Sequence, residues 1–293
     1  MKIAMVSEDA SPLMTHAGIH VGGQNVHVAE LSAAMVRRGH DVTVYTRRDD
    51  PDVPERVTAP QGYAVVHVPA GPARQLPKDE LLRHMGAFAQ FLDSQWLAEP
   101  PDVAHAHFWT SGIATQLAAR AHAVPTVQTF RALGVVKRRH EGAQDSGLNA
   151  RIKLEKLVAT HATWVAATCT DELFELARIG RSRARTSVVP CGVDLDRFST
   201  VGPVSERSER RRIVAVGRLL PRKGFDTMIE ALPNIPDAEY LIIGGPDAKY
   251  VQHDPELRRL GALAIELGWL TGSSSSVRSP TPTCRRCSAQ PTW

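Results

Sequence analysis

The sequence is poor in cysteine and lacks the spacing that a disulfide framework or a complete zinc motif requires. Its 293 residues include four cysteines, which are too few for a disulfide framework. Cys169 and Cys191 each lie beside an apolar, strand-like run and are expected to be buried thiols. Cys284 and Cys287 form half of a zinc motif, and because no second ligand pair lies near them, no metal site is expected.

Long apolar segments are also lacking. No run of about 18 apolar residues occurs, so no integral membrane segment is expected. The apolar residues of Met1–Ser7 are followed at once by Glu8 and Asp9, which makes this run too short for a signal peptide. These two observations predict a cytoplasmic protein.

A strong net charge is missing from most of the chain. The formal net charge is +4 at pH 7, but three arginines and no acid lie beyond Thr271, so the rest of the chain carries only +1. A balance near neutrality gives no reason to expect a nucleic-acid partner. The Gly-x-Gly-x-x-Gly fingerprint is absent too, which argues against a nicotinamide-dependent oxidoreductase.

The sequence does contain a regular alternation of short apolar runs and segments with helical periodicity. Runs without polar alternation are typical of strands covered on both faces; they occur at Ile3–Ser7, Val42–Tyr45, Ala64–Val68, Val103–His107, Thr126–Thr129, Trp164–Ala167 and Ser187–Val189. Helices are expected at Val26–Arg38, Leu81–Trp96, Ser111–Ala123, Asn149–Ala162 and Asp171–Ile179. Because strand–helix alternation produces a parallel sheet with helices on both faces, residues 1–198 are expected to form one doubly wound, Rossmann-like α/β domain.

A second, smaller α/β unit follows a polar linker at residues 199–212. It contains two expected strands and two expected helices, whereas an open nucleotide-binding sheet has about five or six strands. Residues 213–268 are therefore interpreted as an incomplete second Rossmann-like domain. Its expected elements are the strands Ile213–Val216 and Tyr240–Gly244 and the helices Phe225–Leu232 and Glu256–Leu267.

Residues 269–293 differ in composition from everything before them. Serine, proline, threonine, arginine and cysteine replace the acidic helical pattern and the apolar strand pattern. Such a segment cannot bury enough apolar surface to fold and is predicted to be disordered. Two origins stay open: a shift of the reading frame near Gly268, or a disordered tail of independent origin.

Gly22 and Gly23 lie between the first strand and its helix. Backbone N–H groups at the carboxyl end of a parallel strand favour an anion such as phosphate, and glycines let the backbone approach it closely. A tight turn with Asn25 as a helix cap is an equally good interpretation.

His107 ends the strand Val103–His107, where a side chain faces the ligand crevice and can donate a hydrogen bond to a sugar hydroxyl. His105 shares its strand face, which is compatible with a metal pair. Because no third ligand stands nearby, a metal-free role of His107 is favoured.

Arg218 and Lys223 lie in the loop that joins the strand Ile213–Val216 to its helix. Gly217 ends the strand and Gly224 precedes the helix, so two cations and the positive end of a helix dipole converge on one loop. This combination predicts a diphosphate site; a solvated basic loop is the alternative.

Three further charged motifs are assigned structural roles. Asp194 and Asp196 precede the linker and are expected to satisfy backbone N–H groups in a turn. Arg151 and Glu155 have the spacing of an exposed ion pair on one helix face. The basic run Lys137–His140 is expected to be solvated surface.

The ordered combination of these motifs resembles the retaining GT-B glycosyltransferases of family 4. The resemblance covers residues 1–268 and is closest to the branch that includes the mycothiol-pathway and sucrose-synthase-like enzymes. It implies an acceptor-binding domain at residues 1–198 and a nucleotide-sugar-binding domain at residues 213–268. The motifs that carry it are Gly22-Gly23-Gln24-Asn25, His107, TFRALG (129–134), VVPCGVDLDRF (188–198) and VGRLLPRKG (216–224).

The resemblance implies roles for individual residues. Arg218 and Lys223 would hold the diphosphate of a nucleotide-sugar donor, and Gly22 and Gly23 would approach it from the other domain. His107 would hydrogen-bond the transferred sugar and act in catalysis together with the two cations. The positions that match the acceptor side are Asn25, Lys78, Thr129 and Arg151.

The implied reaction transfers a hexosyl group from a nucleotide-diphosphate sugar to a small sugar, polyol or phosphorylated acceptor, with retention and without metal or other cofactor. In the mycothiol-type branch the acceptor is a phosphorylated polyol. Arg131 departs from the pattern, where a histidine is common, and a Glu-x7-Glu segment for the donor is absent after Leu267, so impaired activity is expected. The alternative is a non-catalytic protein whose N-terminal domain binds a sugar or a phosphorylated small molecule.

Overall fold

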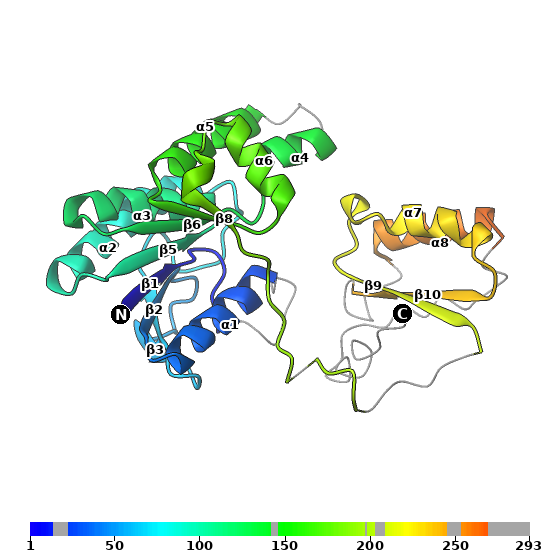
Figure 1. Ribbon diagram of the computed structural model, residues 1–293, viewed down its shortest axis with the longest axis horizontal. Coiled ribbons are helices and arrows are strands. Elements are labelled where there is room, and N and C mark those ends of the chain that lie inside the picture. Colours follow the sequence, from blue (N-terminus) through cyan, green and yellow to red (C-terminus); the bar gives the residue numbers. More distant parts are fainter. Residues whose placement is uncertain (14–22, 142–145, 197, 203–208, 245–252, 269–293) are drawn as a thin grey trace. The chain divides into compact units, whose positions relative to one another are not determined.

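The computed structural model describes residues 1–13, 23–141, 146–196, 198–202, 209–244 and 253–268. The chain divides into two compact units, Met1–Gly192 and Val193–Trp293, whose elements are labelled in Figure 1. The first unit contains a mainly parallel sheet, and the second a parallel sheet with only two strands among the described residues. The α/β class and the smaller second sheet expected from the sequence are confirmed.

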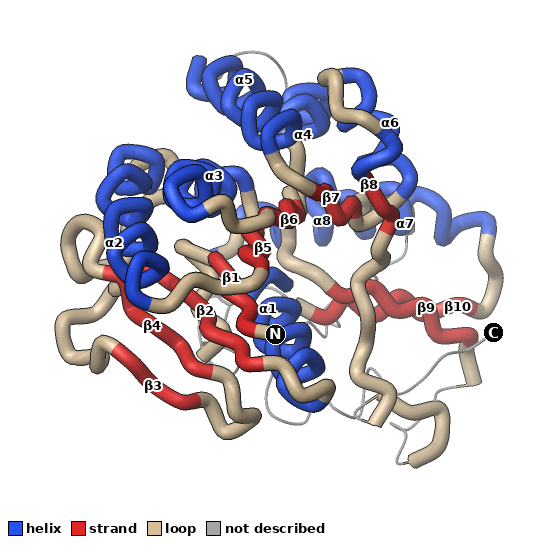
Figure 2. Tube along the Cα trace, turned by 60° about the vertical axis from the view of Figure 1, so that its left-hand side comes forward, coloured by secondary structure: helices blue, strands red, loops and turns tan. Residues whose placement is uncertain are grey.

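The sheet of the first unit has eight strands in the described residues, in the order β3-β4-β2-β1-β5-β6-β7-β8. Every neighbouring pair is parallel except β3 and β4, which run antiparallel. Figure 2 shows β3 beside β4 at the edge of the layer. The strands are β1 Lys2–Val6, β2 Asp41–Arg47, β3 Arg56–Thr58, β4 Ala64–Val68, β5 Val103–His107, β6 Thr126–Thr129, β7 Trp164–Ala167 and β8 Thr186–Val188.

Helices cover both faces of this sheet, because successive residues of a strand point to opposite faces. Ala4 and Val6 of β1 share a buried cluster with α2 and α3, whereas Ile3 and Met5 share one with α1. Figure 1 accordingly shows α1 across the sheet from α2 and α3. The helices are α1 Gly23–Arg37, α2 Met85–Ala98, α3 Trp109–His122, α4 Gly134–Glu141, α5 Ser146–His161 and α6 Thr170–Arg178, with short 3-10 turns η1 Leu81–His84 and η2 Arg183–Arg185.

The described part of the second unit is a two-stranded parallel sheet with two helices. Phe225 and Ile229 of α7 form a buried cluster with Leu260 of α8. None of the helices in the described ranges is long and apolar enough to cross a membrane. The elements of this unit are β9 Arg211–Val216, η3 Pro221–Lys223, α7 Phe225–Ala231, η4 Leu232–Asn234, β10 Ala238–Ile243 and α8 Pro255–Glu266.

Three features of the first unit differ from the expectations. The strand β3 was not predicted, because three residues are too few to show a pattern, and α4 was not predicted, because it is mainly polar. Cys169 and Cys191 are exposed, so the expectation of buried thiols is wrong. Both cysteines follow the carboxyl end of a strand, β7 and β8 respectively, where the chain has left the covered sheet.

Arg181 ties the end of α5 to the turn after α6. Its buried guanidinium donates hydrogen bonds to the carbonyl oxygens of Ala159 at 2.9 Å and Ala162 at 2.7 Å. A hydrogen bond from a charged donor contributes roughly 1.5–3 kcal/mol, so we expect Arg181→Ala to lower the free energy of unfolding by about 3 kcal/mol. Urea denaturation measures this. The exposed Arg185 is the control: Arg185→Ala should change stability by less than about 0.5 kcal/mol, and equal effects of both changes would contradict the assignment.

Candidate functional site

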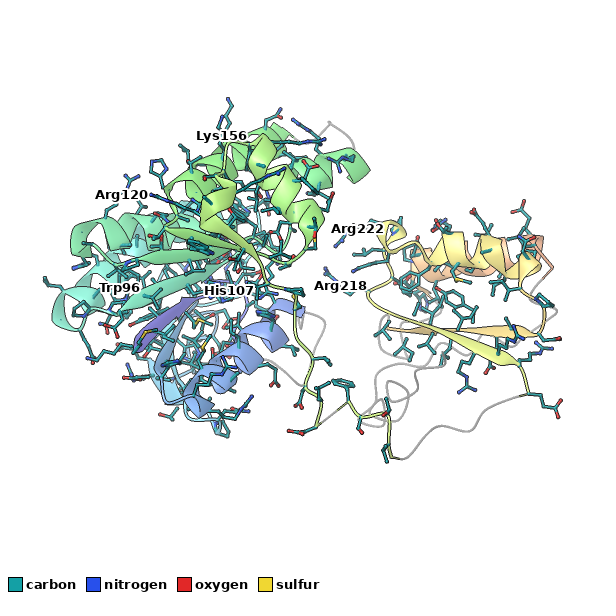
Figure 3. The ribbon with its side chains drawn as sticks, in the orientation of Figure 1. Trp96, His107, Arg120, Lys156, Arg218 and Arg222 are labelled. Atoms are coloured by element: carbon teal, nitrogen blue, oxygen red, sulfur yellow. The ribbon has the colours of Figure 1, made fainter. Side chains whose placement is uncertain are left out.

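The carboxyl ends of β1, β5 and β6 gather most of the residues expected to act in the first unit. These strands are neighbours and run parallel, with Val6 paired to Ala106 and His107 paired to Thr129. Figure 3 labels His107 at the end of β5. Because ligands of open α/β sheets bind outside this edge, we call it the carboxyl edge of the first unit.

Three histidine rings cluster at the carboxyl edge. The ring centroid of His107 lies 4.2 Å from that of His105 and 5.9 Å from that of His27 on α1. Burial, with added repulsion from Arg131, lowers the pKa of His105 to about 3 and the pKa of His27 to about 4. Burial also lowers the pKa of His107 well below its ordinary value. All three imidazoles are therefore neutral at pH 7.

The hydrogen bonding of His107 fixes its tautomer. Nη2 of Arg131 lies 3.4 Å from Nδ1 of His107. Because a guanidinium can only donate, Nδ1 is the acceptor and Nε2 bears the proton. The side chain is fully buried, and in the described structure Nε2 has no hydrogen-bond partner. His107 thus has an unsatisfied N–H donor, which is the group that its expected role toward a sugar hydroxyl requires.

Glu8 was not predicted as a site residue, although its position two residues beyond the end of β1 is the signal that could have identified it. Its buried carboxylate accepts hydrogen bonds from the hydroxyls of Thr110 and Ser111 at the start of α3. Burial raises the pKa of Glu8, and the two hydroxyl donors oppose this rise. Gln24 of α1 donates to the carbonyl oxygen of His107 at 3.4 Å. These bonds join α1, β1, β5 and α3 at one edge.

Lys78 and Arg151, both expected on the acceptor side, lie near one aromatic ring. Nζ of Lys78 is 5.6 Å and Cζ of Arg151 is 5.1 Å from the ring centroid of Phe108, within the range of cation–π attraction. Lys78 is 72% exposed and pairs with Asp9 at 2.7 Å. The structure therefore places two cations beside an aromatic surface whose role the sequence pattern did not reveal.

The ion pair of Arg151 and Glu155 is buried, which corrects the expectation of an exposed pair. Arg151 Nε lies 2.7 Å from Glu155 Oε1, and the side chains are 16% and 1% exposed. The burial arises because the loop after β6 covers the pair: Glu155 accepts a hydrogen bond from the N–H of Gly134 at 2.8 Å, and Arg151 Nη2 donates to the carbonyl oxygen of Ala132 at 2.7 Å. Nη1 of Arg151 has no hydrogen-bond partner among the described residues.

Phe108 and Arg131 have unusual backbone conformations at the ends of β5 and β6. Phe108 has φ 76° and ψ 158°, and Arg131 has φ 67°. Such conformations of non-glycine residues cost roughly 1–3 kcal/mol and cluster at functional sites. The strain at two neighbouring strand ends marks the carboxyl edge as the candidate site of this unit.

Asn25 and Thr129 are buried at the same edge and are bonded to protein groups. Nδ2 of Asn25 donates to the carbonyl oxygen of Ser11 at 3.0 Å, and the hydroxyl of Thr129 lies 2.9 Å from Nε2 of His105. Gly23 is exposed as the first residue of α1. The other expected glycine, Gly22, lies outside the described residues.

Arg218 and Lys223 lie in the loop between β9 and α7 of the second unit, where the sequence placed them. Both side chains are exposed, and neither forms an ion pair with any residue that the structure describes; Figure 3 labels Arg218. Gly224, with φ 69°, precedes α7. Gly244 follows β10 so close to Gly217 that a Cβ would lie 2.0 Å from the carbonyl oxygen of Gly217. The backbone after β10 therefore approaches the backbone after β9 so closely that only glycine fits at position 244.

Asp194 and Asp196 form a turn, as predicted. Oδ1 of Asp194 accepts a hydrogen bond from the backbone N–H of Asp196 at 3.0 Å, so the side chain satisfies local backbone. Within the described ranges, no group of three or more His, Cys, Asp or Glu side chains is placed to hold a metal ion.

Sequence comparisons identify the family. The family model described as Glycosyltransferase Family 4 matches residues 21–197. The chain belongs to glycosyltransferase family 4. Related proteins include the D-inositol 3-phosphate glycosyltransferases of Xylanimonas cellulosilytica, 33% identical over 289 residues, and of Geodermatophilus obscurus, 34% identical over 283 residues. These alignments cover 91% and 89% of this chain but 67% and 62% of the relatives, so the chain spans about two thirds of their length.

Solved structures of glycosyltransferases share the fold of this family 4 chain. Sucrose-phosphate synthase from Thermosynechococcus elongatus matches with a TM-score of 0.75 at 25% identity, covering 92% of this chain and 68% of that one. Anabaena HepE in complex with UDP and glucose matches in fold, with a TM-score of 0.60 at 15% identity, covering 95% and 68% of the two chains. The resemblance to GT-B glycosyltransferases that the motifs predicted is confirmed.

The depressed pKa of His105 makes the stability of the first unit depend on pH. The unfolded chain binds a proton near the ordinary pKa of 6.5, whereas the folded chain does not until about pH 3. The stabilisation is therefore complete above pH 6.5 and is lost as the pH falls. When the pH falls from about 7.5 to about 5, we expect His105 alone to lower the free energy of unfolding by up to about 2 kcal/mol.

Urea denaturation of the wild type and of His105→Gln at both pH values measures this contribution of His105 to the free energy of unfolding. The variant should lose less stability on acidification, and contributions from other groups such as Glu8 cancel in the comparison. An equal loss in both proteins would contradict the neutral state of His105.

Proposed function

We propose that the chain transfers a hexosyl group from a nucleotide-diphosphate sugar to a hydroxyl of a small phosphorylated polyol, with retention of the anomeric configuration. The observation that carries this proposal is the cluster of Lys78, Phe108 and Arg151 at the carboxyl edge, in a chain related to D-inositol 3-phosphate glycosyltransferases. An inositol phosphate combines a phosphate with a ring of hydroxyl groups, and this cluster offers partners for both.

The acceptor phosphate is assigned to Lys78 and Arg151. Nη1 of Arg151 has no partner among the described residues, and Lys78 is exposed with one acidic partner, Asp9. Both cations can form charge-assisted hydrogen bonds with phosphate oxygens. The ring of Phe108 supports the apolar face of the polyol, and Asn25 and Thr129, at the same edge, orient its hydroxyl groups.

The donor diphosphate is assigned to Arg218 and Lys223 of the second unit. Because these two exposed cations have no ion-pair partner among the described residues, they are available to neutralise the charge that develops on the departing diphosphate. The N–H at Nε2 of His107 donates to a hydroxyl of the transferred sugar.

The proposed reaction needs no protein nucleophile. The bond between the anomeric carbon and the diphosphate oxygen breaks, and the acceptor oxygen forms a bond on the same face of that carbon. The acceptor proton moves to the departing phosphate oxygen, so a nucleoside diphosphate and a glycosylated acceptor are released. His107, Arg218 and Lys223 act by positioning and by charge stabilisation.

Removing a phosphate contact should weaken acceptor binding. We expect Lys78→Ala to raise the Kd for D-inositol 3-phosphate about tenfold or more, because a charge-assisted hydrogen bond contributes roughly 1.5–3 kcal/mol. The double variant Arg151→Gln/Glu155→Gln should act similarly, and it avoids leaving Glu155 as a buried unpaired charge. Isothermal titration calorimetry of the full chain measures both.

Lys156, on the exposed side of α5 and labelled in Figure 3, provides the matched control. Lys156→Ala should leave the Kd unchanged. Unchanged Kd values in both test variants, with wild-type binding intact, would show that the phosphate binds elsewhere. No binding by the wild type would rule out the proposed acceptor class.

Donor binding is expected to need no divalent metal, because Arg218 and Lys223 supply the positive charge that a metal would otherwise provide. The Kd for UDP-glucose, used as the probe, should be the same with EDTA as with added manganese. A Kd that rises about tenfold or more with EDTA and recovers with manganese would instead assign the diphosphate to a metal site.

A further inference from the structure

Arg131 is a cation that forms no ion pair with a carboxylate among the described residues. Its guanidinium donates to Sγ of Cys191 at 3.4 Å and lies 3.4 Å from Nδ1 of His107. Glu172 attracts it electrostatically, but no carboxylate of a described residue forms an ion pair with it. Burial lowers the pKa of Arg131. A charge withdrawn from water without a counterion is unfavourable unless a ligand supplies one.

Two neighbouring N–H donors in this cluster also lack an acceptor. Nε of Arg131 and Nε2 of His107 are buried atoms without a hydrogen-bond partner in the described structure. Buried polar groups are nearly always paired, so each such atom calls for an explanation. The neutral rings of His27 and His105 cannot supply negative charge. Among the described residues, Glu172 and Cys191 attract Arg131, but no carboxylate forms a hydrogen bond or an ion pair with Arg131 or with His107.

A carboxylate fits this requirement better than a hydroxyl or a phosphate. Nε and Nη2 lie on one edge of the planar guanidinium and can donate two parallel hydrogen bonds to one carboxylate. The present contact of that edge with His107, at 3.4 Å, is near the upper limit for a hydrogen bond. A hydroxyl would leave the charge uncompensated, and the phosphates of the proposed reaction already have cations of their own.

We propose that Arg131 is a specificity-determining residue that binds a carboxylate on the transferred sugar, so that the donor is the nucleotide-diphosphate derivative of a uronic acid. This inference rests on the proposed function, in which His107 holds that sugar. Nη2 of Arg131 lies 3.4 Å from Nδ1 of His107, so a sugar that meets His107 with the groups around C6 would bring a C6 carboxylate to the guanidinium. A neutral hexose leaves this charge unpaired and is disfavoured for that reason.

Two sugar phosphates that differ only at C6 test the assignment without depending on the nucleotide base. We would titrate the full chain with α-D-glucuronic acid 1-phosphate and with α-D-glucose 1-phosphate. The wild type should bind the uronate about tenfold or more tightly. Arg131→Gln should abolish this preference and leave the affinity for glucose 1-phosphate unchanged. Arg131→Lys keeps the positive charge but cannot donate two parallel hydrogen bonds, so it should retain part of the preference for the uronate.

The exposed Arg120 on α3 is the control, and Arg120→Gln should keep the wild-type preference. Thermal unfolding identifies any variant that fails to fold. If Arg131→Gln does not fold, Arg131→Lys is compared with the wild type instead. Equal binding of both probes by the wild type, or a preference that survives in folded Arg131→Gln, overturns the uronate assignment alone. Binding of neither probe overturns this inference and the sugar-holding role of His107 in the proposed function together.

Discussion

The parallel pairing of β5 with β1 and β6 is the constraint on which the candidate site depends. It aligns three strand ends, and a bond from the N–H of Phe108 to the carbonyl oxygen of Thr129, at 2.8 Å, continues the pairing beyond the last residue of β5. A shift of one residue would turn His107 to the other face of the sheet. The same pairing holds Phe108 and Arg131 in conformations that an isolated chain rarely adopts.

Charge at the carboxyl edge is compensated unevenly. Arg151 is neutralised by the buried Glu155, and Lys78 pairs with Asp9 in an exposed position. Arg131 has no such partner among the described residues, and the neighbouring imidazoles are held neutral by burial. Of these three cations, Arg131 alone lacks a carboxylate partner among the described residues, which agrees with an acidic sugar.

Much of the fold could be predicted from the sequence, because buried parallel strands appear as short apolar runs. The strands β4, β5, β6 and β7 have the predicted bounds. The sequence also placed His107 at the carboxyl end of a strand, which is where the structure has it. The burial of Arg151 and Glu155 could not be predicted, because it depends on the loop after β6, and the role of Phe108 depends on side chains from distant segments.

A crystal structure of the chain with D-inositol 3-phosphate is the measurement that tests the central claim most directly. The account predicts the phosphate in contact with Nζ of Lys78 and the guanidinium of Arg151, with the polyol ring against Phe108 and its hydroxyls directed toward Asn25 and Thr129. Phosphate bound only at Arg218 and Lys223 of the second unit, with an unoccupied carboxyl edge in the first, would contradict it.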